Sequence, residues 1–282
     1  MVKEIDGVTQ NTSMSEYTFS TTGEHTVVFT SSYINNNLFN GCTRLSSIII
    51  PNGVTSIGQS AFNGCTNLAS VVIPNSVTNI GDSAFYGCGN LATLIISNSV
   101  TSIGDSAFSG CRNLSYIAIP EGVTNINNSL FATCDNVSCI KLPSGITAIA
   151  NNAFRACKNL LSINIPNGVT SIGENALYGC TSLTEVTIPN SVTSISNYVF
   201  TGCSALTKCT IGSGVTSMGI AVFYDNKNLT SITIKATTPP TVSQNVLGDT
   251  TCPVYVPSSS VDVYKAASGW SAYASRIQAI PE

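Results

Sequence analysis

The stretch CTNLASVVIPNSVTNIGDSAFYGC, residues 65–88, begins and ends on a cysteine and sets the period of the chain. The two cysteines stand 23 residues apart, and this spacing recurs through the 282-residue sequence without insertion. A phenylalanine or leucine precedes each member of the series by three residues, and a leucine or valine follows it by three. Asparagine takes the ninth place. The series, which we call the cysteine ladder, is Cys42, Cys65, Cys88, Cys111, Cys134, Cys157, Cys180, Cys203 and Asn226.

Each repeat carries the signal for one short strand followed by a turn. Val71 and Ile73 are spaced by two, so their side chains share one face of a strand, which Pro74 ends. We expect the chain to return through a short helical piece, such as SAFNGC at 60–65. One repeat cannot bury its own apolar side chains, so neighbouring repeats must stack. The sequence therefore predicts an α/β repeat fold, a solenoid of about nine 23-residue coils with a parallel β-sheet on one face.

The pattern L-x-x-I-x-I-P-x-x-V-x-x-I-x-x-x-A-F-x-G-C resembles the BspA-like (Treponema pallidum type) leucine-rich repeats over about residues 25–235. The tail CPVYVPSSSVDVYKAASGWSAYASRIQAI resembles the C-terminal cap of such proteins from gut Bacteroidetes. Members of this family are mostly bacterial surface or secreted proteins implicated in adhesion to host proteins or other cells. The resemblance thus implies a cell-surface or secreted location, although the N-terminus carries no apolar signal-peptide core.

A solenoid needs caps, because its terminal coils would otherwise expose apolar core and sheet edge. We expect a capping hairpin over 16–29 and a loosely held segment over 1–15. At the other end, Val254–Val256 predicts a last strand, and a broken helix with Trp270 and Ile277 on its apolar face is expected to plug the final coil. The predicted regions are an N-terminal segment with hairpin and degenerate coil at 1–37, the solenoid at 38–235 and a strand-plus-helix cap at 236–282.

Eleven cysteines raise the question of whether the ladder is chemistry or packing. Disulfides would need alternating pairs, and metal sites usually show paired cysteines at closer spacing. Because Asn226 substitutes for cysteine, we interpret the ladder as buried reduced thiols that pack and bond to the turn backbone. Cys209 falls at an inward strand position and is expected in the core. Cys139 falls at an outward, otherwise polar position and is the candidate exposed thiol.

Signals of catalysis are weak in this sequence. The single histidine, His25, has no partner nearby in the chain, and no nucleotide-binding or zinc-protease motif occurs. Asp82 and Asp105 occupy equivalent places on neighbouring coils and would offer Ca²⁺ two carboxylates, but we prefer a structural role at the start of a short helix. A charged fraction of 9% and a net charge of −3 argue against nucleic acid. We predict no enzyme activity, no cofactor and no metal.

The outward face of the strands is the more informative surface. Its central position is apolar in the first four coils, at Ile49, Val72, Ile95 and Ala118, with Tyr116 beside them, and polar afterwards. We call these five residues the apolar stripe. Contiguous exposed apolar area usually marks a contact site, although strand propensity alone also favours isoleucine and valine.

Our hypothesis is therefore a non-enzymatic interaction scaffold, adhesin-like by resemblance. Its partner would be a host-matrix or cell-surface protein or a glycan. A second copy of the chain and an absent N-terminal flank are the other occupants considered for the apolar stripe. The alternative is a structural spacer or stalk that presents other domains and has no ligand of its own.

Overall fold

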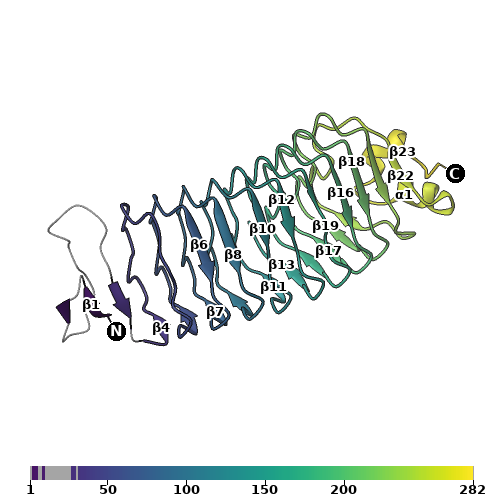
Figure 1. Cartoon of the computed structure of the whole chain (residues 1–282). Helices are drawn as coiled ribbons and strands as arrows, with labels where there is room; N and C mark the ends of the chain where they lie inside the picture. The colour runs from purple at the N-terminus through teal and green to yellow at the C-terminus, as the bar shows by residue number, and fades with distance from the viewer. Residues whose placement is uncertain (1, 6–7, 10–26, 30, 282) are drawn as a thin grey trace.

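The computed structural model describes residues 2–5, 8–9, 27–29 and 31–281. They form a rod of about 11 turns, each of about 23 residues, with the two caps at its ends (Figure 1). The predicted solenoid is confirmed, but the expected number of coils was too low. The degenerate coil predicted before the solenoid is a coil of the rod, since Ile34 of β4, Tyr33–Ile34, pairs with Ile57, and the C-terminal cap adds further turns.

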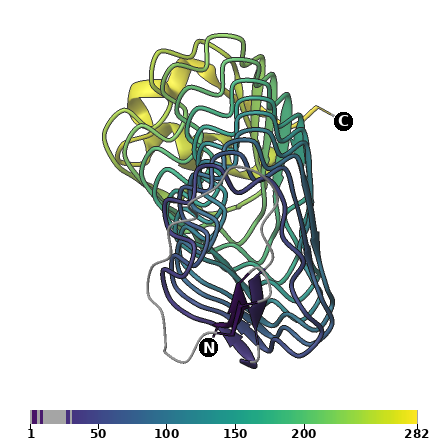
Figure 2. The same ribbon diagram turned by 60° about the vertical axis from the view of Figure 1, so that its left-hand side comes forward.

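Two rows of parallel strands run along the rod, where the sequence predicted one sheet. The strands of each row follow one another along the rod (Figures 1 and 2). Equivalent residues pair, such as Val72 with Ile95, so like side chains lie in lines along the rod. The long-strand row is β6 Ser70–Ile73, β8 Thr93–Ile96, β10 Tyr116–Ala118, β12 Cys139–Lys141, β14 Ser162–Ile163, β16 Glu185–Ile188, β18 Lys208–Ile211, β20 Ser231–Ile234, β22 Val254–Val256 and β23 Ile277–Ala279. The short-strand row is β4, β5 Ser56–Ile57, β7 Asn79–Ile80, β9 Ser102–Ile103, β11 Asn125–Ile126, β13 Ala148–Ile149, β15 Ser171–Ile172, β17 Ser194–Ile195, β19 Ser217–Met218 and β21 Thr241–Val242.

The third side of each coil is a turn, so the predicted helical piece is wrong. In SAFNGC, Ser60 has a φ of 52° and Gly64 a φ of 70°, which interrupt any helix. The N–H of Phe62 donates to the carbonyl of Ala84 in the next coil at 2.7 Å, and such bonds alternate with local i→i−3 bonds. Within the described residues, helices occur only in the C-terminal cap, as α1 Val261–Ala266 and the 3₁₀ turns η1 Ser258–Ser260 and η2 Ser271–Arg276.

The core is one continuous apolar column enclosed by the three sides. A line of phenylalanines runs through it, all buried except the half-buried Phe39, with neighbouring rings nearly parallel and their centroids between 5.0 and 6.1 Å apart. Leu177 interrupts the line. The rings that stack are Phe39, Phe62, Phe85, Phe108, Phe131 and Phe154, and separately Phe200 and Phe223.

The C-terminal cap closes the last coil with aromatic side chains. Trp270 is fully buried and donates through Nε1 to the carbonyl of Pro240 at 2.8 Å, and Tyr264 donates to the carbonyl of Ala236 at 2.9 Å. The predicted strand over Val254–Val256 is confirmed as β22. The expectation that Ile277 lies on a helix is wrong, because it begins β23, which pairs with β22.

The N-terminal cap is an antiparallel sheet in the order β2-β1-β3, formed by Val8–Thr9, Val2–Ile5 and Val27–Phe29. The expectation of a loose segment over 1–15 is therefore wrong at residues 2–5 and 8–9, where strand pairing holds the chain. Of the predicted hairpin over 16–29, the part at 16–26 lies outside the described residues.

Candidate functional site

The apolar stripe lies on the outer face of the long-strand row. Alternation along β6 buries Val71 and Ile73 and turns Val72 outward. A bridge between Ser47 and Ser70 brings Ile49 beside Val72. The exposed fractions are 90% for Ile49, 55% for Val72, 54% for Ile95 and 51% for Tyr116, and Ala118 is also exposed. The stripe is therefore an exposed apolar row on the outer strand face, with Ile49 just outside the named strands.

Two shallow hollows flank Ile95. A hollow of about 590 Å³ is lined by Asn52, Val72, Ile73, Pro74, Asn75, Ser76, Ile95 and Ser97. A hollow of about 350 Å³ is lined by Ala92, Thr93, Leu94, Ile95, Ile96, Ser115, Tyr116 and Ala118. Both combine apolar side chains with neutral polar groups, and Ile95 forms the ridge between them.

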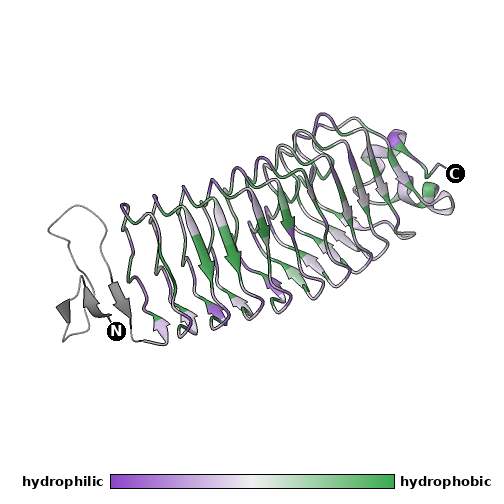
Figure 3. Ribbon diagram, viewed as in Figure 1, coloured by the Kyte–Doolittle hydropathy of each residue, from purple (hydrophilic) through white to green (hydrophobic). Residues whose placement is uncertain are grey.

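This part of the strand face carries no charged side chain, as the segments 46–52, 69–75, 92–98 and 115–118 show. Farther along the rod the same face is polar, with Lys141 on β12 and an exposed pair in which Lys208 Nζ lies 3.9 Å from Glu185. Figure 3 shows the difference, since β6 and β8 are coloured hydrophobic and β16 and β18 are paler. The face therefore has an apolar end and a polar end.

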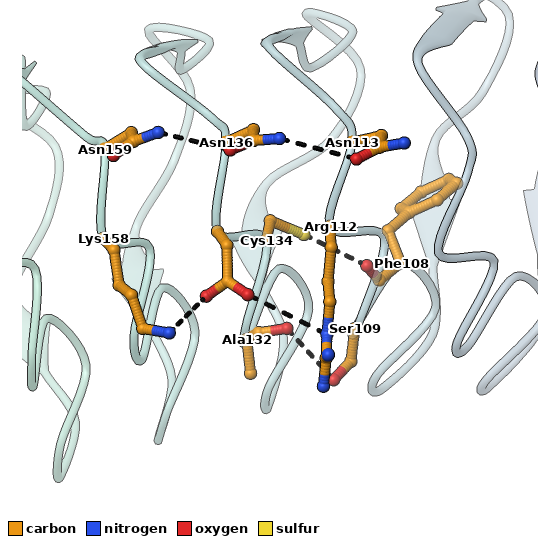
Figure 4. Close-up of polar contacts among 10 residues, drawn as sticks. Phe108, Ser109, Arg112, Asn113, Ala132, Cys134, Asn136, Lys158 and Asn159 are labelled. Carbon is orange, nitrogen blue, oxygen red and sulfur yellow. Dashed lines mark hydrogen bonds and ion pairs between the residues drawn. The ribbon is translucent and has the colours of Figure 1, made fainter.

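The cysteine ladder holds neighbouring coils together. From the second member on, each Sγ donates to the carbonyl of the phenylalanine or leucine 26 residues earlier, at 3.1 to 3.3 Å. Figure 4 shows the bond from Cys134 to Phe108. Asn226 makes the same contact through Nδ2 to Phe200 at 2.8 Å, which explains why asparagine fits this position. Burial raises the pKa of Cys65, Cys88, Cys157 and Cys203 to about 12, so these thiols are neutral at physiological pH.

The remaining cysteines differ from the ladder and from one another. Cys42, predicted to be buried, is exposed at the first ladder position. Cys139 is exposed on β12, and Cys209 is buried in β18, where the sequence placed them. Cys252 is buried in the cap, where Arg276 donates to its carbonyl at 2.8 Å.

Asp82 and Asp105 form contacts between coils. Asp82 Oδ1 accepts the N–H of Asp105 at 2.9 Å, and Asp105 Oδ1 accepts the N–H of Asn128 at 3.0 Å. The two aspartates are structural, as predicted. The expectation that they lie at the start of a short helix is wrong, because no helix begins there and the carboxylates accept main-chain N–H groups of the next coil. Within the described residues, no group of three or more His, Cys, Asp or Glu side chains could hold a metal ion. His25 lies outside the described residues.

Two further rows were missed by the sequence analysis. Asparagines two residues after the ladder cysteines link coils amide to amide, as Asn136 does with Asn113 at 3.5 Å and Asn159 with Asn136 at 3.3 Å (Figure 4). Beside them Asp135 pairs with Lys158 at 3.2 Å. Exposed tyrosines form the second row on the turn side: Tyr86, Tyr178 and Tyr224. Each follows the core phenylalanine or leucine by one residue, and this offset could have predicted the row from the sequence.

Comparison with known proteins agrees with this architecture. A family model described as BspA type leucine rich repeat region, in six copies, matches residues 32–161 and 147–251. A leucine rich cell surface protein from Faecalibacterium prausnitzii is 27% identical with a TM-score of 0.56, over 86% of this chain and 80% of that one. A leucine-rich repeat protein from Bacteroides ovatus is 20% identical with a TM-score of 0.54, over 96% and 100%, a likeness of fold alone. No curated protein matched the chain. Among the described residues, no helix is long and apolar enough to cross a membrane.

Proposed function

The chain belongs to the BspA-type leucine-rich repeat family, and from this premise we propose that it is a non-enzymatic interaction scaffold on the bacterial surface or secreted from the cell. In this proposal it acts as an adhesin-like protein and binds a host or cell-surface protein through the apolar stripe. The cell-surface relative from Faecalibacterium prausnitzii supports the location, because it covers most of both chains.

The observation that carries the proposal is the exposure of the apolar stripe on a strand face without charge. Covering apolar surface contributes about 25 cal/mol per Å², so a partner that covers these side chains gains affinity from each of them. Binding to strands that are already ordered also avoids most of the entropy cost of arranging a flexible site. Scattered exposed apolar residues are normal on a protein surface, but a continuous row usually marks a contact.

The test is a binding array of host-matrix proteins and cell-surface glycans, probed with the purified chain. The paired substitutions Ile49→Asp and Val72→Asp place two charges on the stripe, at exposed positions where folding tolerates them. The matched control is Thr187→Asp with Thr210→Asp, which changes two paired residues at the same strand position in the polar half.

The expected result is a protein signal that the stripe variant loses and the control variant keeps. Sedimentation of the same three proteins tests whether the partner is a second copy of the chain. If the unmodified chain binds nothing on the array and stays monomeric, or if both variants bind alike, the stripe is not the binding site. The uniform polar half of the strand face would then favour the spacer or stalk.

A further inference from the structure

The strand rows are interrupted between β8 and β10. No strand pairing joins β8 to β10 in the long-strand row or β9 to β11 in the short-strand row. At every other junction between described coils at least one of the two rows pairs. The two coils remain joined along the turn side, where Phe108 N donates to the carbonyl of Leu130 at 3.1 Å. The coils therefore separate on the sheet side and stay together on the turn side.

Asn127 marks the interruption in the short-strand row. The equivalent residue in the preceding coils is glycine, and Gly104 N donates to the carbonyl of Ile80 at 2.8 Å. In the interrupted coil, Asn127 Nδ2 donates to the carbonyl of Ile103 at 2.6 Å. This side-chain bond replaces the equivalent bond from the main-chain N–H. A Cβ alone does not cause this, because Ala150 at the next equivalent position still donates from its N–H to Ile126 at 2.8 Å.

The separation opens a slit between β8 and β10. Leu94 and Ile96 point inward yet are only half-buried, whereas the equivalent Val71 and Ile73 of the neighbouring coil are 1% exposed. The hollow of about 350 Å³ lies at this place, between Ile95 and Tyr116 of the stripe. The main-chain groups of β8 and β10 that face each other have no strand partner there. The slit thus has apolar walls, unpaired main-chain donors and acceptors, and no charge.

We propose that this slit is the anchor pocket of the binding face and takes a tyrosine or tryptophan side chain of the partner protein. The inference rests on the proposed function and adds the chemistry of the partner. Apolar walls suit the ring, and the unpaired main-chain groups suit the hydroxyl or indole N–H at its tip. Aromatic anchors of this kind, seated in a pocket near the centre of an interface, often carry most of the binding energy.

The test uses p-cresol and indole as probes of the slit, with toluene as the analogue that lacks a polar tip. Binding to the full chain is followed by NMR on the methyl groups of Leu94 and Ile96. Saturable shifts are expected for p-cresol and indole, with toluene about two- to tenfold weaker, as expected for one neutral hydrogen bond. The absence of a saturable shift for p-cresol and indole would overturn the proposal, as would equal affinity for toluene.

Two variants check that the slit itself binds the probe. Asn127→Gly frees the Ile103 carbonyl, so the amides of Ser115 and Thr124 should become protected from hydrogen exchange and p-cresol affinity should fall by more than about tenfold. Ala150→Gly is the matched control, because that junction is already paired, and it should bind as the unmodified chain does. Tight p-cresol binding by an Asn127→Gly chain with protected amides would refute the proposal.

If Asn127→Gly leaves the amides unprotected, Ala118→Ile tests whether the slit binds p-cresol. Position 118 is exposed and holds isoleucine or valine in the three preceding coils, so the variant is expected to fold. It narrows the hollow but keeps the stripe apolar, and it should weaken p-cresol binding; unchanged binding would refute the slit. The Ile49→Asp and Val72→Asp chain should still bind p-cresol, so the anchor pocket and the proposed function can fail separately.

Discussion

Replacing Phe131 in the aromatic line separates what ring stacking contributes from what burial contributes. Its ring is fully buried between Phe108, with centroids 5.7 Å apart, and Phe154, at 6.1 Å. Phe131→Ala is expected to cost about 3–5 kcal/mol, because it removes the buried side chain and leaves a cavity. Phe131→Leu keeps most of the volume but loses two stacked contacts, each worth about 0.5–1.5 kcal/mol.

The chain offers a natural comparison at Phe200, which has one stacked neighbour, Phe223 at 5.6 Å, and the natural Leu177 on its other side. Phe200→Leu loses one stacked contact, so it should cost about 0.5–1.5 kcal/mol less than Phe131→Leu. Urea unfolding gives the free energies, and hydrogen exchange at neighbouring amides shows whether the coils unfold together, because solenoids unfold in part. Equal costs for the two leucine variants would refute the stacking argument and leave burial alone.

Three further outcomes follow from the same contacts. Native labelling with iodoacetamide at pH 8 should modify exposed Cys139 well before the buried ladder thiols, as mass spectrometry of digested protein would show, and equal labelling would contradict the ladder contacts. Burial raises the pKa of the ladder thiols from 9.0 to about 12 in the folded state. Their contribution to the stability of the fold is therefore complete below pH 9 and is lost as the pH rises towards 12. The Tm measured across that range should fall. Gly81→Ala should cost about 1–3 kcal/mol, because its Cβ would lie 2.7 Å from Gln59 N, whereas Gly53→Ala meets no atom within 4 Å and should be nearly neutral in urea unfolding.

The spacing of the ladder was enough to predict the solenoid and its register, and the resemblance of the repeat pattern implied the family. An unbroken period places the same side chain at the same height in every coil, so the inward rows follow once one coil is understood. The role of Asn226 was also predictable, because a substitution within a row shows what the row requires. Placement of Ile49 and Cys139 on the outer face followed from strand alternation.

Other features depend on contacts that a one-dimensional pattern does not show. SAFNGC has the composition of a helix start, but its N–H groups bond the next coil, which no local signal reveals. The same is true of Asp82, whose carboxylate binds the N–H one coil away. The slit lies at the coil where the Asn127 side chain replaces the main-chain donor to one carbonyl.

In a repeat of this kind each inward side chain contacts its own equivalent one coil away, so the choice of residue is set by the fold. An outward side chain also lies beside its equivalent, but it is not enclosed by the core, so its identity is freer to serve another purpose. Leu177 and Asn226 change inward rows yet keep the coils in contact. Asn127 instead lies in the coil where strand pairing is lost, and the same coil carries the last two residues of the apolar stripe. A departure from the repeat and a departure from surface polarity thus meet at one place, and that coincidence is why we locate the anchor of the binding face there.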